Sequence, residues 1–151
     1  MSRPPKCRKV DFLPHLTYFK PAGVPMKELT EVTLTIEELE AIRLKDLMGL
    51  EQEACAERMG VSRPTYHRIL TSARQKVADA LINGRAIKVE GGNYQVVIRH
   101  FRCRKCGHQW EDVCGRRAEL TCPSCETEQI LRINEDGSLF NCHMWKEGKR
   151  I

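Results

Sequence analysis

Hydrophobic residues recur at helical spacing over three segments between residues 35 and 83. This spacing predicts helices over about 35–48, 52–59 and 62–82, because apolar side chains three or four positions apart share one face of a helix. In the second helix, Cys55 and Met59 are expected to face inward. In the third, the apolar face is formed by Tyr66, Ile69, Leu70, Ala73, Val77, Ala80 and Leu81.

The pattern changes on both sides of these helices. Residues 86–89 and 94–98 flank the pair Gly91-Gly92, which predicts a β-hairpin. Five prolines within residues 1–28 exclude a continuous helix there, so we interpret residues 1–30 as an extended arm. A domain boundary is expected near residue 100, where cysteines begin to set the pattern.

The second and third predicted helices are joined like those of a helix-turn-helix. The small Ala56 allows two helices to approach closely, and Gly60 suits a turn that needs a left-handed backbone. Ser62 followed by Pro64 suits the start of the next helix. Tyr66 is unusual at an inward position that more often holds Val or Ile, so its hydroxyl needs a hydrogen-bond partner.

Charge is unevenly distributed, although the whole chain carries only +5 at pH 7. Residues 31–59 contain eight acidic and three basic residues, whereas residues 62–88 contain six basic and one acidic. Residues 1–20 add five basic and one acidic. Positive charge gathered on one helix and one arm suits a polyanion, and a helix-turn-helix lays its second helix in the DNA major groove. The alternative is a solvated helix face in a protein that binds no DNA.

The predicted DNA contacts lie on the third helix and on the arm. Arg63 and Arg68 are placed for bidentate contacts to guanine, each worth about 1–3 kcal/mol of discrimination. His67 and Thr71 are candidates for base edges or phosphates, and Arg74 for the phosphate backbone. The full set is Ser62, Arg63, Pro64, Thr65, His67, Arg68, Thr71 and Arg74 on the helix, and Arg3, Lys6, Arg8 and Lys9 on the arm.

Half of the eight cysteines follow the pattern C-x2-C, fifteen residues, C-x2-C. They are Cys103, Cys106, Cys122 and Cys125. Two thiolates three positions apart in a tight turn can bind one ion, and two such turns give tetrahedral sulfur coordination. With strands expected at 109–113 and 129–133, the pattern predicts a zinc ribbon. Four closed sulfur ligands favour a structural zinc over a catalytic one. A rubredoxin-like iron centre has related ligands, and a disulfide pair is the weaker alternative.

The remaining cysteines carry less information. Cys55 is interpreted as a small core residue. Cys7, Cys114, Cys142 and His143 have irregular spacing, so a second metal site and free or packed thiols both remain open.

Other classes of protein are disfavoured. The N-terminus lacks a secretory signal, and no apolar run approaches the roughly 18 residues of a membrane span. We therefore expect a cytoplasmic protein without membrane contact, where reduced thiols bind metal more often than they form disulfides. Since the sequence shows no nucleophile elbow, phosphate loop or paired-carboxylate pattern, an enzyme is not expected.

Several motifs resemble a known family. RPPKCRKV at residues 3–10, YFKPAGVP at 18–25 and LEAIRL at 39–44, with the predicted helix-turn-helix, resemble the uncharacterised prokaryotic family called domain of unknown function 134 over about residues 3–95. The helices also resemble region 4 of sigma factors, which reads promoter DNA. The resemblance implies a DNA-binding protein. It also implies a weaker cap for the second helix, because Glu51 stands where related sequences tend to have Ser.

Together these patterns predict a mainly α-helical, sigma region 4-like helix-turn-helix domain over residues 31–99, ending in the hairpin. It follows the basic arm of residues 1–30 and precedes a small β zinc-ribbon domain over 100–151. The expected function is sequence-specific binding of double-stranded DNA in transcription regulation, with homodimerisation left open. Two alternatives remain: a protein-interaction module that docks on transcription machinery, and a metal- or redox-responsive DNA-binding sensor.

Overall fold

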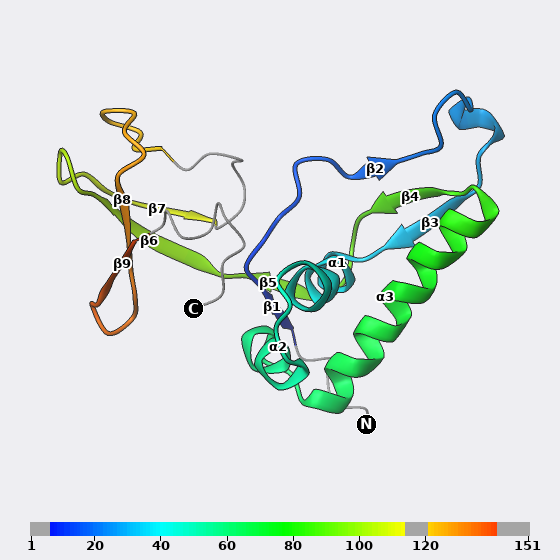
Figure 1. Cartoon of the computed structure of the whole chain (residues 1–151), viewed down its shortest axis with the longest axis horizontal. Coiled ribbons are helices and arrows are strands. Elements are labelled where there is room, and N and C mark those ends of the chain that lie inside the picture. The colour runs from blue at the N-terminus through cyan, green and yellow to red at the C-terminus, as the bar shows by residue number, and fades with distance from the viewer. Residues whose placement is uncertain (1–6, 114–120, 142–151) are drawn as a thin grey trace. The chain divides into compact units, whose positions relative to one another are not determined.

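The computed structural model describes residues 7–113 and 121–141, which form two compact units (Figure 1). One unit, called here the helical unit, contains residues 7–10 and 14–96. The other, called the cysteine unit, contains residues 11–13, 97–113 and 121–141. Within these described ranges no helix combines the length and the apolar character needed to cross a membrane.

The predicted helices are all present in the helical unit. They are α1 (Ile36–Ile42), continued by the π-helical turn η2 (Arg43–Leu47), α2 (Gln52–Met59) and α3 (Arg63–Asn83). A short 3-10 turn, η1, covers Met26–Glu28. Figure 1 shows α1 and α2 packed along the N-terminal half of α3, with a small sheet beside its C-terminal half.

Capping residues explain where these helices begin and end. The backbone N–H of Glu38 donates to the Thr35 hydroxyl, and the Thr35 N–H donates to the Glu38 carboxylate at 2.9 Å, so a complete capping box begins α1. Gly60 and Gly84 end α2 and α3 in the left-handed region, with φ of 65° and 63°. Glu51 makes no side-chain cap at the start of α2, as the family resemblance implied.

Five short strands make the helical unit a mixed α/β structure, so the prediction of a mainly α domain was wrong. The strands β2 (Tyr18–Phe19), β4 (Ala86–Val89) and β3 (Glu31–Leu34) form a sheet in the order β2-β4-β3. A second pair joins β1 (Arg8–Val10) to β5 (Tyr94–Val96) in parallel. Residues expected in an extended arm thus supply two strands.

The predicted hairpin between residues 86 and 98 was also wrong. Both strands exist, but β4 pairs with β2 and β3, and β5 pairs with β1. The intervening loop binds the start of α1 instead of folding β5 back onto β4. Ile36 donates its N–H to the Gly91 carbonyl at 3.1 Å, and the Asn93 N–H donates to the Glu37 carboxylate at 2.7 Å.

The core of the helical unit lies where α1, η2, α2 and α3 meet. It is formed by Ala41, Leu44, Cys55, Ala56, Met59, Tyr66 and Leu70, all buried. Tyr66 is fully buried, and its hydroxyl donates to the Ala41 carbonyl at 2.7 Å. This bond supplies the partner that the sequence required, and burial raises the pKa of Tyr66.

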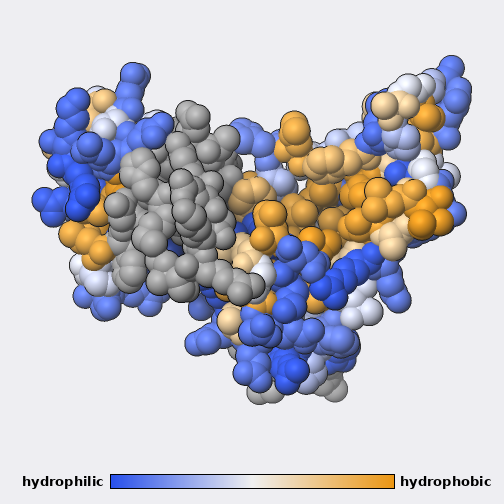
Figure 2. Space-filling view, in the orientation of Figure 1, coloured by the Kyte–Doolittle hydropathy of each residue, from blue (hydrophilic) through white to orange (hydrophobic). Residues whose placement is uncertain are grey.

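The apolar face of α3 does not stay covered along its whole length. Leu81 is 76% exposed, contrary to the inward position predicted for it, and Ile82 is 83% exposed. Figure 2 shows apolar surface over this end of the unit, around β2 and β4. The apolar residues keep their helical spacing to the end of α3, but α1 and α2 cover only its N-terminal half, so the last apolar residues are exposed.

The cysteine unit is a four-stranded antiparallel sheet in the order β7-β6-β8-β9. Its strands are β6 (Ile98–Cys103), β7 (Gln109–Val113), β8 (Ile130–Ile133) and β9 (Leu139–Asn141). The strands predicted at 109–113 and 129–133 are therefore confirmed. Among the described residues the buried apolar side chains here are few: Phe101, Cys103, Cys122 and Ile130.

Candidate nucleic-acid interface and candidate metal centre

The two faces of α3 differ sharply in burial. Tyr66, Leu70 and Ala73 are buried in the core, whereas Arg63, His67, Arg68 and Thr71 are exposed. Ser62 and Pro64 are exposed at the first turn, and Thr65 is half-buried. In the described part of the chain, the side chains of His67, Arg68 and Thr71 have no hydrogen-bond or ion-pair partner. The polar face predicted for this helix is thus accessible.

The first turn of α3 uses two of the predicted contact residues for its own structure. The Ser62 hydroxyl accepts the Thr65 N–H at 3.4 Å, and the two side-chain hydroxyls lie 2.9 Å apart. This cap fixes the direction of the helix start, and so fixes where the neighbouring Arg63 projects.

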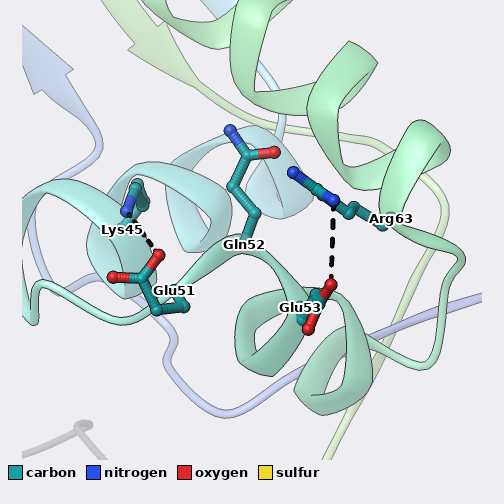
Figure 3. A pocket seen from close by; sticks show the side chains of 5 residues that line it. All are labelled: Lys45, Glu51, Gln52, Glu53 and Arg63. Carbon is teal, nitrogen blue, oxygen red and sulfur yellow. Dashed lines mark ion pairs between the residues drawn. The ribbon is translucent and has the colours of Figure 1, made fainter.

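Arg63 borders an open hollow at the N-terminus of α2. Figure 3 shows its guanidinium directed toward Glu53, with Lys45 directed toward Glu51 and Gln52 between the two pairs. The Arg63–Glu53 distance is 3.7 Å, and both side chains are mostly exposed, at 64% and 80%. Such a pair contributes little stability and is easily exchanged for another partner.

Arg74 is held by an ion pair that the sequence did not predict. Its Nε and Nη2 donate to the Asp46 carboxylate at 3.2 and 2.6 Å. These hydrogen bonds lower the pKa of Asp46. Asp46 lies in η2, 28 positions away in sequence, so no local signal pointed to it. A phosphate would have to compete with this carboxylate for Arg74.

Lys9 of the predicted arm lies beside the turn between α2 and α3. Its aliphatic side chain passes within 3.6 Å of the position that a Cβ on Gly60 would occupy. The neighbouring Arg8 is held by the hydrogen bond from its N–H to the Asn93 carbonyl at 3.1 Å. The pairing of β1 with β5 therefore fixes two cations of the arm. The other two, Arg3 and Lys6, lie outside the described residues.

The predicted metal ligands converge in the cysteine unit. The Sγ atoms of Cys103, Cys106, Cys122 and Cys125 all lie within 4.8 Å of one another. Two of the separations, Cys103–Cys125 and Cys106–Cys122, are 3.6 Å. A tetrahedral ion with metal–sulfur bonds of about 2.3 Å needs sulfur atoms about 3.8 Å apart. All four are free thiols, so the donor set and its spacing fit a metal ion and not a disulfide pair.

Each pair of cysteines lies on the same kind of backbone loop. The N–H of Cys103 donates to the His108 carbonyl, and that of Cys122 to the Thr127 carbonyl, at 2.8 and 2.9 Å. We call these two loops, residues 103–108 and 122–127, the first and second knuckles. The residue after each second cysteine has positive φ, 75° at Gly107 and 58° at Glu126.

Backbone N–H groups in the knuckles point at sulfur. The N–H of Cys106 donates to the Cys103 Sγ, and that of Ser124 to the Cys122 Sγ, both at 3.4 Å. Burial opposes ionisation of Cys103, but the N–H groups of Cys106 and Lys105 outweigh it and lower the pKa of Cys103 to about 6. Cys103 is thus held toward thiolate, the form that binds metal. At Cys125 the Thr127 N–H acts in the same direction, but burial and the three neighbouring thiols outweigh it and raise the pKa to about 12.

The sequence located these four thiols but missed the left-handed backbone at Glu126. The left-handed position at Glu126 has no signal of its own, because Gly107 alone marks the motif in sequence. Of the second metal site that the sequence left open, Cys114, Cys142 and His143 lie outside the described residues. The remaining thiol, that of Cys7, donates to the Asn93 side-chain oxygen at 3.0 Å.

The comparisons with known proteins agree with the motifs at the start of the chain. Residues 1–97 match the family described as "Protein of unknown function DUF134". A relative named "UPF0251 protein" from Moorella thermoacetica is 64% identical over 130 residues, covering 86% of each chain. One with the same name from Desulforudis audaxviator is 59% identical over 131 residues, covering 87% of this chain and 86% of its own.

Similarity extends beyond the family match. A UPF0251 protein from Methanocella arvoryzae is 47% identical over 133 residues, covering 86% of this chain and 80% of its own. Because these alignments are longer than 97 residues, they include part of the cysteine unit. No solved structure matches the chain. The chain belongs to the DUF134 family, whose members here carry the name UPF0251 protein.

Proposed function

We propose that this chain is a sequence-specific DNA-binding protein that regulates transcription, with α2 and α3 acting as a helix-turn-helix. The observation that carries the proposal is the two-sided burial of α3. Its inner face is fixed by Tyr66, while the opposite face presents Arg63, His67 and Arg68 to solvent. A helix that enters the major groove needs such a base-facing surface on a rigid support.

The proposed contacts divide into those that read bases and those that bind phosphates. Arg68 has no intramolecular partner within the described residues, and Arg63 has only the weak pair with Glu53, so both can turn to guanine O6 and N7. His67 and Thr71 lie on the same exposed face. Lys9, beside the turn, is suited to a phosphate, which adds affinity without sequence information.

The four cysteines are proposed to hold a structural zinc ion. Tetrahedral thiolate sites bind zinc or iron. A zinc ion with four sulfur ligands has no coordination position left for water or substrate, so its role is structural. The buried apolar set of the cysteine unit is small, so metal binding would supply much of its folding free energy. An iron-loaded protein would be coloured, which separates the two metals.

A protein-interaction role is the second candidate, and one observation favours it. Leu47 is 80% exposed at the end of η2, and the exposed carboxylates Glu51 and Glu53 follow it four and six positions later in sequence. An exposed apolar side chain with acidic neighbours suits a basic partner protein, such as a component of the transcription machinery. Weak, salt-insensitive DNA binding together with stable capture of such a partner would favour this function.

The test of the proposed function is selection of bound sequences from random duplex DNA by the metal-loaded chain. Enrichment of one motif is expected, and a palindromic motif would also indicate a homodimer. Lys9→Ala should weaken binding to all sequences alike and make the slope of log affinity against log salt less negative by about 0.9. Recovery of unselected sequences only would overturn the proposal.

A further inference from the structure

Three cations lie at or beside the tip of the β6–β7 hairpin, in the described part of the cysteine unit. Arg102, Arg104 and Lys105 are all exposed, and among the described residues none of them forms an ion pair. By contrast, Arg99 of the same strand is paired with Asp11. The three cations of the tip are thus available to an anionic partner.

A stack of aromatic rings leads from the core of this unit to the same tip. Phe101 is buried, Trp110 is half-buried and His108 is exposed. The Phe101 and Trp110 ring centroids are 5.8 Å apart, and so are those of Trp110 and His108, with only 16° between the latter two ring planes. His108 is therefore the outer ring of an ordered stack.

The first knuckle holds the cations and the rings together. Arg104 and Lys105 lie within this knuckle, which ends at His108 and is closed by the hydrogen bond from the Cys103 N–H to the His108 carbonyl. Arg102 pairs with Gln109, one position from the Phe101–Trp110 pair, so it lies on the other face of the hairpin. Because Cys103 and Cys106 belong to the thiol cluster, a bound metal would make this arrangement rigid. Little conformational entropy would then be lost when a ligand binds.

We propose that this tip binds single-stranded nucleic acid, with an unpaired base stacked on His108 and phosphates bound by Arg104 and Lys105. Cations supply attraction to the backbone, and an exposed ring supplies a surface for an unstacked base. In a duplex both faces of each base are already stacked, so no base can stack on His108. An acidic peptide could pair with the cations but has no base to stack on the ring. This site belongs to the cysteine unit, whereas α3 belongs to the helical unit.

The charge of the second knuckle supports this placement. Glu126 is exposed and occupies the position equivalent to Gly107, and Glu128 follows the knuckle as a further exposed carboxylate. The two knuckles therefore differ in charge although their backbones match. A polyanion would be repelled from the second knuckle and directed along the first.

The test measures binding of the metal-loaded full chain to fluorescent oligothymidylate and oligouridylate of about 15 nucleotides, toward the upper end of the lengths that single OB-fold domains cover. His108→Ala should weaken binding about 5- to 150-fold, the range for loss of one base–aromatic stack, and His108→Phe should restore it. The double change Arg104→Ala with Lys105→Ala should make the salt slope less negative by about 1.4.

Lys27→Ala is the matched control, since it removes an exposed cation from the helical unit and should leave this binding unchanged. Metal content is measured for every variant. A variant that binds the nucleic acid more weakly but keeps a full complement of metal has lost the contact and not the fold. Preference between the two oligonucleotides distinguishes DNA from RNA.

Equal binding by His108→Ala, His108→Phe and the parent chain, or capture of an acidic peptide in preference to either oligonucleotide, would overturn the inference. Binding of duplex DNA is measured separately. The proposed function of α3 can therefore hold when the inference about single strands fails, and the reverse.

Discussion

At the scale of single residues, local chemistry decides which positions are predictable. The hydroxyl of Tyr66 needed a partner and has one in the Ala41 carbonyl. Glu126 is different, because it is the one non-glycine residue with positive φ in the described part of the chain. Nothing in its own identity indicates this, and only the match between the two knuckles reveals that it occupies a glycine-type position.

Glu126→Gly should therefore stabilise the cysteine unit. A left-handed backbone costs a non-glycine residue about 1–2 kcal/mol, which exceeds the 0.5–1 kcal/mol or so that glycine loses in chain entropy. The expected gain in the free energy of unfolding is up to about 1 kcal/mol, measured by denaturation of the metal-loaded chain. The reverse change, Gly107→Glu at the equivalent position, should destabilise; a Glu126→Gly variant that unfolds more easily would contradict this account of the knuckles.

At the scale of elements, the helices were predictable and most strand pairings were not. Helical period and caps are local signals, and they placed α2 and α3 almost to the residue. The partners of β4 and β5 come from residues 8–34, and strands of two to four residues carry no periodic pattern. The contacts between α1 and α3 were likewise hidden, since Glu38 and Lys76 are 38 positions apart.

Glu38 should make the stability of the helical unit depend on pH. Burial opposes its charge, but hydrogen bonds from Lys76, Thr35 and Ser72 outweigh this and lower the pKa of Glu38 below its usual 4.5. Its contribution is thus present above about pH 4.5 and lost as pH falls through the lower pKa of the folded state. Glu38→Gln should cost about 1.5–3 kcal/mol at neutral pH and flatten the acid limb of the stability curve.

The measurement is urea denaturation at a series of pH values from neutral to below 4.5, with unfolding monitored by the far-ultraviolet circular dichroism of the helices. Glu57→Gln is the control, since Glu57 is exposed on α2. If Glu38→Gln and the parent chain lost stability in parallel as the pH fell, Glu38 would not be the responsible group.

At the scale of the whole molecule, the thiol cluster was predictable because its spacing lies within the motif itself. Four cysteines at C-x2-C spacing indicated the ligands, and the structure brings all four together. The surface around them was not predictable, because it depends on which residues pair across β6 and β7. The division into two units further implies that a metal in one need not be required for the fold of the other.

Removal of the metal should unfold the cysteine unit and spare the helical unit. Chelation is expected to abolish the near-ultraviolet signal of the Phe101–Trp110 stack while the helical far-ultraviolet signal persists. Duplex binding through α3 should change little. A large change in duplex affinity on chelation or mild oxidation, with the helices intact, would instead support the metal- or redox-responsive alternative.

The central claim, that the exposed face of α3 reads bases, is tested most directly by comparing the parent chain with Arg68→Ala on every single-base variant of a selected duplex site. The account predicts that Arg68→Ala loses about 1–3 kcal/mol of discrimination at one guanine and keeps the preferences at other positions. Identical base preferences in the two proteins, or no preference in the parent chain, would contradict it.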